Sequence, residues 1–189
     1  MDTIVFAIIA VVLIYRLYSI LGRDDTPIPQ QASNTSSEPR ANKQPDKLEL
    51  LLRRHNIPLF LKPAFAAILL KDSTFDFKHF LSGAESAYSM IVTHAFEHHW
   101  DEISDYIAEE VLKQLQKTLS SKQKVRVKVS DASIVDAEFK NPTGFITVQF
   151  KSKLQTRTAT KERLEDWLFM RDLEQDNPTW VLHKIVPFH

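Results

Sequence analysis

The longest apolar stretch of the chain lies at its N-terminus. No polar side chain occurs from Ile4 to Ile14, and apolar residues remain frequent up to Leu21. About 20 helical residues span roughly 30 Å, the thickness of the hydrocarbon core of a bilayer. We therefore predict a transmembrane anchor at residues 1–21. A cleaved signal peptide is the alternative, but such peptides begin with basic residues, and only Asp2 precedes this apolar run.

The charges beside the anchor predict its orientation. Arg16 and Arg23 follow the apolar run, and no basic side chain precedes it. Positively charged flanks stay on the cytoplasmic side of a membrane, so the rest of the chain is expected there. Residues 22–46 contain four prolines and many small polar residues, a composition typical of a disordered linker.

A short basic segment follows at residues 47–71. It carries five Lys or Arg against one Glu, and its leucines recur at helical spacing. Two short basic amphipathic helices beside an anchor can lie on an anionic lipid surface. The candidate membrane-surface residues are Arg53, Arg54, Lys62, Phe65 and Lys71. Alternatively, the pair packs on the folded domain, because periodicity does not say what covers an apolar stripe.

The remaining residues, 72–189, are predicted to form the folded domain. Residues 77–96 have the clearest 3.6-residue period, with Asp76 as N-cap and Phe75 and Phe80 placed for a hydrophobic staple. A second helical stretch is expected across the apolar residues Trp100, Ile103, Ile107, Val111, Leu115 and Leu119.

From Lys124 onward the period of the pattern becomes two, which indicates strands. The expected turns are Asn141–Gly144 and residues 176–178, and two further strands are expected at Glu165–Arg171 and Trp180–Val186. Helices followed by a meander of strands predict an α+β fold, with the helices packed on one face of a curved antiparallel sheet.

Composition excludes several kinds of site. The chain has no Cys, which removes disulfides, thiolate catalysis and cysteine-built metal centres. Only three Gly occur in 189 residues, so no Gly-rich phosphate loop is present. The formal net charge of zero argues against a general nucleic-acid binder, because such proteins carry a basic surplus.

Several segments resemble the membrane-anchored Tim44-like family, named after the mitochondrial inner-membrane subunit that tethers the import motor. The segment FDFKHFLSGAESAYSMIVTHAF at residues 75–96 resembles the family's signature helix. The strand-like segments are VSDASIVDAEFKN, TVQFKSKL and EDWLFMRDLEQDNPTWVLHKI. The anchor and PAFAAILLKD at residues 63–72 resemble short bacterial members, often described as adaptors. Phe77 departs from the pattern, because many relatives have Pro near this position.

The resemblance implies a cone-like fold similar to nuclear transport factor two, with a pocket between helices and sheet. It also implies a membrane-tethered scaffold in the bacterial inner membrane, single-pass, with the C-terminal domain in the cytoplasm. The mitochondrial inner membrane is the alternative location. Fold carries over between relatives better than activity does.

Three groups of residues are candidates for chemistry. His94, Glu97 and His98 match the short His-x-x-Glu-His zinc pattern, but no third ligand is evident, and solvated residues at a helix end are expected instead. Lys122, Lys124, Arg126 and Lys128 form a basic strand face, interpreted as the outer side of an exposed strand. An enzyme could use inward-pointing Tyr88, Asp166 or His183, although Asp166 is more simply an outward residue.

These patterns predict a membrane-anchored adaptor or scaffold that binds a protein partner, with a role in protein translocation or in membrane-protein quality control. The expected partners are anionic lipids and a protein client, without nucleic acid. No catalytic residue, cofactor or metal is expected. The alternative function is a cone-fold domain that binds lipid or a small ligand, or an enzyme that uses its apolar pocket.

Overall fold

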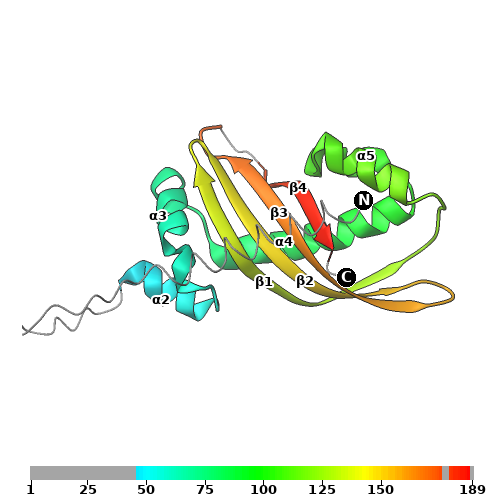
Figure 1. The fold of residues 1–189 in the computed structure, drawn as a ribbon, viewed down its shortest axis with the longest axis horizontal. Helices are drawn as coiled ribbons and strands as arrows, with labels where there is room; N and C mark the ends of the chain where they lie inside the picture. Colours follow the sequence, from blue (N-terminus) through cyan, green and yellow to red (C-terminus); the bar gives the residue numbers. More distant parts are fainter. Residues whose placement is uncertain (1–45, 176–178, 188–189) are drawn as a thin grey trace, which may run out of the picture. The chain divides into compact units, whose positions relative to one another are not determined.

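The domain is an α+β fold in which helices cover a four-stranded antiparallel sheet. The computed structural model describes residues 46–175 and 179–187. The strands follow chain order in the sheet: β1 Arg126–Lys140, β2 Thr143–Gln155, β3 Thr160–Asp172 and β4 Val181–Pro187. The long helix α4, Phe77–Phe96, lies behind the sheet in Figure 1. The predicted α+β class, with helices on an antiparallel sheet, is therefore confirmed.

The predicted anchor at residues 1–21 lies outside the described residues, as do residues 22–45 of the predicted linker and the predicted turn at 176–178. Among the residues that are described, no helix is both long and apolar enough to cross a membrane.

Helix α4 forms as its sequence predicts. The Asp76 carboxylate accepts a hydrogen bond from the backbone N–H of His79 at 2.7 Å, which caps the first turn. Phe75 and Phe80 close the hydrophobic staple, with ring centroids 5.7 Å apart. The apolar stripe of the helix is buried against the sheet: Phe77, Phe80, Ala84, Tyr88, Ile91, Val92 and Ala95.

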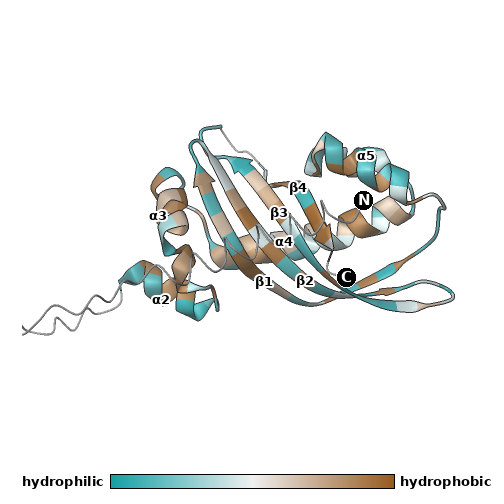
Figure 2. Cartoon of the chain, viewed as in Figure 1, coloured by the Kyte–Doolittle hydropathy of each residue, from teal (hydrophilic) through white to brown (hydrophobic). Residues whose placement is uncertain are grey.

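The sheet follows the two-residue alternation of its sequence, and Figure 2 shows hydrophobic and hydrophilic positions alternating along the strands. In β2, Ile146, Val148 and Phe150 are buried, and their neighbours are more exposed. In β3, the buried positions are Glu165, Trp167 and Phe169. Register shifts after Val129 and Ile134 mark bulges in β1, which increase local twist and bending.

The predicted second helix is wrong over its first half. Two short 3-10 turns, η2 Trp100–Glu102 and η3 Ser104–Tyr106, precede α5, which spans only Glu109–Thr118. Between them Ile107 is extended and bridges Leu182 of β4, while the Ala108 N–H donates to the Leu182 carbonyl at 2.8 Å. Apolar residues spaced three or four apart also fit successive 3-10 turns, which the period alone does not distinguish.

Residues 47–71 form α2 Lys47–Arg54, η1 Leu59–Leu61 and α3 Lys62–Lys71. Asp46, which the sequence placed in the linker, is the N-cap of α2. The apolar stripes join the same core as α4 and the sheet through Leu52, Ile57, Leu61, Phe65 and Ile68. The structure thus favours the interpretation in which this segment packs on the domain.

Candidate functional site

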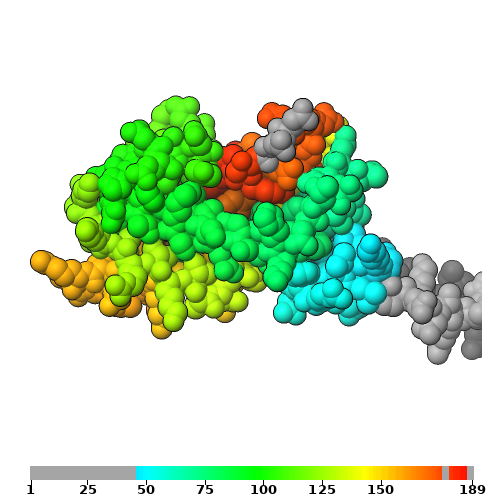
Figure 3. All heavy atoms as spheres, turned by 180° about the vertical axis from the view of Figure 1, so that it is seen from behind, coloured from blue at the N-terminus to red at the C-terminus, as the bar shows by residue number. Residues whose placement is uncertain are grey.

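A pocket of about 620 Å³ opens beside α4. Figure 3, viewed from the side of α4, shows a hollow between the green residues of α4 and the orange and red residues of β3 and β4. The pocket wall includes the aromatic residues Phe75, Phe80, Phe169 and Trp180, with Gly83, Ala84, Ala87 and Met90 from α4 and Tyr106 from η3. Pockets of this size and apolar lining are typical of ligand or peptide sites.

An ion pair lies on the pocket wall, which also includes the ionisable residues Asp76 and His79. Arg171 Nη1 lies 3.0 Å from Asp72 Oδ2, and both side chains are largely buried. Burial alone raises the pKa of Asp72, but hydrogen bonds from Thr74 and the charge of Arg171 outweigh it and lower the pKa below its ordinary value. The Arg171 guanidinium also lies 6.0 Å from the centre of the Trp180 ring. These groups are thus paired by charge, but the buried Asp72 Oδ2 and Arg171 Nε make no hydrogen bond with the described residues, an arrangement suited to orienting a bound segment.

Gly83 leaves space on the helix side of the pocket. A Cβ atom built on Gly83 meets no atom within 4 Å, although the residue lines the pocket. Larger side chains at this position therefore point into open space and fill the pocket without displacing the core.

A buried polar cluster lies on the same face of the sheet, beneath Tyr88. The Tyr88 hydroxyl donates to Glu165 Oε2 at 2.9 Å and lies 2.7 Å from Ser152 Oγ. Arg163 Nη1 lies 3.0 Å from Glu165 Oε1. Burial, together with the charge of Glu165, raises the pKa of Tyr88 above its ordinary value. Glu165 and Arg163 also line a second, smaller cavity of about 170 Å³ beside α5.

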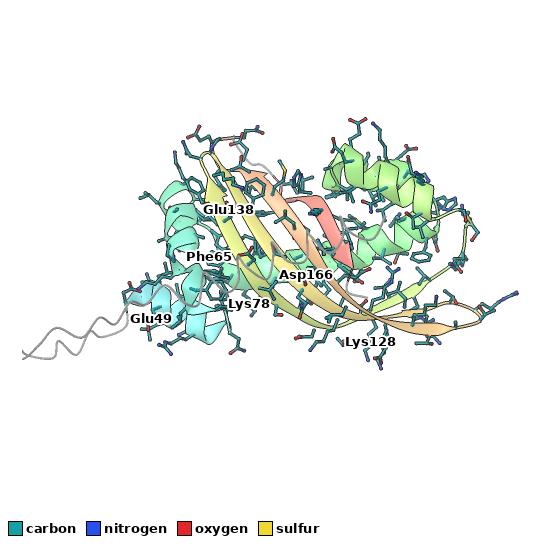
Figure 4. The ribbon with its side chains drawn as sticks, in the orientation of Figure 1. Glu49, Phe65, Lys78, Lys128, Glu138 and Asp166 are labelled. Carbon is teal, nitrogen blue, oxygen red and sulfur yellow. The ribbon has the colours of Figure 1, made fainter. Side chains whose placement is uncertain are left out.

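The three residues considered for an enzyme site do not come together. Tyr88 is fully buried, but His183 is exposed. Asp166 lies on the sheet face opposite α4, where it accepts a hydrogen bond from Gln149 at 3.1 Å (Figure 4). Its neighbour Glu165 is the carboxylate that points inward. Glu165 occupies the same side of β3 as Trp167 and Phe169, two and four residues later, and this spacing predicts an inward side chain. The sequence analysis overlooked it.

The candidate membrane-surface residues divide into two kinds. Arg53, Arg54 and Lys71 are exposed, and Lys62 is partly exposed. Phe65 is completely buried and contacts Phe75 and Phe77, so its side chain has no surface to offer lipid in this fold (Figure 4). The sequence analysis missed the apolar residues that are exposed in this segment: Leu50, Leu59, Phe60 and Leu70.

Ion pairs offset part of the positive charge of this segment. Arg53 pairs with Glu49 at 2.8 Å, Lys62 with Asp46 at 2.7 Å and Lys71 with Glu174 at 2.8 Å.

Phe65 is buried because it lies on the inner side of α3, and the residues of this side cover the edge of the sheet and α4.

The other two sequence candidates are placed as follows. Lys122, Lys124, Arg126 and Lys128 are all exposed, as expected for a solvent-facing side, although Lys122 and Lys124 precede β1 and only Arg126 and Lys128 belong to it. His98 is turned away from His94 and stacks on Trp100, with ring centroids 5.4 Å apart. His94, Glu97 and His98 therefore do not form the metal pattern that their spacing suggests.

A family comparison agrees with this fold. The model of the Tim44-like domain matches residues 61–187, which is more than half of the chain. The chain belongs to the Tim44-like family. The resemblance found in the sequence is thereby confirmed, and the family indicates a membrane-associated, translocase-related domain. None of the curated proteins matches the chain.

The Tim44-like match begins within η1 and includes α3, so part of the basic segment belongs to the family domain. It also covers every residue that lines the large pocket.

Proposed function

We propose that this Tim44-like chain is a membrane-anchored adaptor whose large pocket holds an apolar segment of a protein partner at the inner membrane. The observation that carries the proposal is the pocket itself, which combines an aromatic wall with an internally paired charge. Such a surface binds apolar side chains, while Asp72 and Arg171 can fix the direction of a bound backbone.

Three ionisable groups of the wall have structural partners, whereas His79 on the same wall is exposed. Asp72 accepts hydrogen bonds from Thr74 and pairs with Arg171, and Asp76 caps α4. These contacts favour a binding role for Asp72, Arg171 and Asp76 over a catalytic one. The alternative occupant is a lipid acyl chain, which would use the same aromatic wall.

Photocrosslinking in intact membranes tests the proposal. A photoreactive phenylalanine analogue at Ala87, which lines the pocket, should give discrete crosslinked bands that contain a second protein. The same analogue at Arg126, on the exposed outer side of β1, is the matched control and should not give these bands. Adducts to lipid alone at Ala87 would contradict a protein occupant and favour the alternative.

The exposed apolar residues of 47–71 support a second part of the proposal, contact with the membrane surface. Phe60 is 73% exposed and Leu70 is 86% exposed, beside the basic residues of the same segment. Exposed apolar side chains next to Lys and Arg are typical of surfaces that bind anionic lipid.

A flotation assay measures this contact. Residues 43–189 form one compact unit, so a chain that begins at Lys43 lacks the anchor but keeps Asp46 and the core. It should float weakly with anionic vesicles, and less at high salt. Replacing Arg53 and Arg54 by Ser should weaken binding about thirtyfold, since each of the two basic residues near the surface contributes about 1 kcal/mol. Phe60→Ser should weaken it further.

The matched control is replacement of Lys124 and Arg126 by Ser, which removes the same charge at the start of β1. If the Lys124 and Arg126 replacements weakened vesicle binding as much as the Arg53 and Arg54 replacements, a specific role for residues 47–71 would be contradicted. A chain that begins at Asp72 is not a suitable control, because it also lacks the buried Leu52, Phe65 and Ile68.

A further inference from the structure

The end of α4 has a specific backbone turn that brings two histidines together. His98 has a φ of 56°, in the left-handed region. The His99 N–H donates to the His94 carbonyl at 2.8 Å, and the His98 N–H donates to the Ala95 carbonyl at 3.2 Å. This pattern is a Schellman motif, in which the third-last helical residue and the second residue after the cap contact each other. That contact is usually between apolar side chains, whereas here it joins His94 and His99.

A carboxylate completes the cluster. Glu102, from η2, places Oε2 at 2.9 Å from His94 Nδ1 and Oε1 at 3.9 Å from His99 Nδ1. One ligand atom from each of the three residues lies within 4.8 Å of the other two. In a tetrahedral zinc site with bonds of roughly 2.0 Å, ligand atoms are about 3.3 Å apart, so small side-chain rotations suffice.

The hydrogen bonds of the cluster are incomplete. His94 Nδ1 is buried and makes no hydrogen bond, although the Glu102 carboxylate lies beside it. A buried ring nitrogen without an aligned hydrogen bond is unusual, and a cation between it and the Glu102 carboxylate would bind both groups. Two imidazoles and one carboxylate form a donor set that suits zinc, whereas magnesium and calcium prefer oxygen donors alone.

We propose that His94, His99 and Glu102 bind one zinc ion, with water in the fourth position. The site joins the C-terminal end of α4 to η2. The chain that follows η2 carries Tyr106, which lines the large pocket, so the ion would fix the pocket wall on this side. His98 takes no part, because the turn directs its ring to Trp100.

Competitive titration tests the site. The full chain, purified in detergent without a histidine tag and stripped with a chelator, is titrated with zinc against a fluorescent zinc chelator. We expect one zinc per chain, and His94→Gln, His99→Gln and Glu102→Gln should each weaken binding at least tenfold. His98→Asn is the matched control, since Asn tolerates the left-handed region, and it should change affinity less than twofold.

A thermal melt provides the second readout. Zinc should raise the melting temperature of the wild-type chain and of His98→Asn, but not that of His99→Gln. His99 and Glu102 are exposed enough that their Gln variants should fold, which circular dichroism checks. Binding well below one equivalent, or wild-type affinity in all three variants, would overturn the proposal and leave the cluster as an ion pair.

Discussion

Tyr88→Asp is expected to unfold the domain. Tyr88 is fully buried on α4, its ring lies 4.6 Å from Phe150 and 4.5 Å from Trp167, and its hydroxyl donates to Glu165. The substitution leaves a cavity and places a second carboxylate beside the buried Glu165. A cavity of this kind costs about 3–5 kcal/mol and a buried unpaired charge several more, which together approach the whole stability of a domain.

Tyr88→Phe is the matched control. It keeps the ring contacts and removes only the hydroxyl, so the loss should be about 1–3 kcal/mol, with the fold retained. Chemical denaturation followed by circular dichroism measures both variants. If the Tyr88→Asp variant unfolded at the same denaturant concentration as wild type, α4 would have to present a different face to the sheet.

Phe65→Ala should destabilise the domain by about 3–5 kcal/mol, because Phe65 is completely buried between Phe75 and Phe77. Phe60→Ala is the matched control from the same segment. Phe60 is mostly exposed, so the same truncation there should change stability by about 0.5 kcal/mol or less.

The same denaturation measurement compares the two phenylalanines. If Phe65→Ala were as stable as Phe60→Ala, α3 would not be docked on the sheet and Phe65 would again be available to lipid. If Phe60→Ala alone were destabilising, the assignment of buried and exposed faces in residues 47–71 would be reversed.

The parts of the fold that were predicted correctly depend on local pattern. The cap at Asp76, the Phe75–Phe80 staple and the stripe of α4 follow from spacing along one helix, which the sequence contains in full. The alternation in β2 and β3 likewise records which side of the sheet faces α4. These features need no knowledge of distant residues.

The sequence did not decide those features that depend on distant contacts. Residues 47–71 showed amphipathic stripes, but only the tertiary structure shows that the sheet and α4 cover them. The extended backbone at Ile107 depends on pairing with Leu182, which lies far along the chain. The left-handed turn at His98 places the ring of His99, and not that of His98, beside His94, which helical spacing does not predict.

The residues that line the pocket also could not be predicted from the sequence. Its wall combines residues of α4 with Arg171 from β3 and Trp180 from the segment before β4. The sequence predicted a pocket through the family resemblance, but spacing along the chain does not bring Asp72 to Arg171. That pairing requires the arrangement of the helices on the sheet.

The central claim is that the pocket holds a partner, and a side chain that fills the pocket tests it most directly. The yield of the partner crosslink from Ala87 is compared in Gly83→Leu and Gly83→Ala membranes. A Cβ at this position meets no atom within 4 Å, and both residues suit a helix interior better than Gly, so both variants should fold. We predict that Gly83→Leu lowers the yield at least fivefold while Gly83→Ala leaves it near the wild-type level. Equal yields in the two variants would contradict the account.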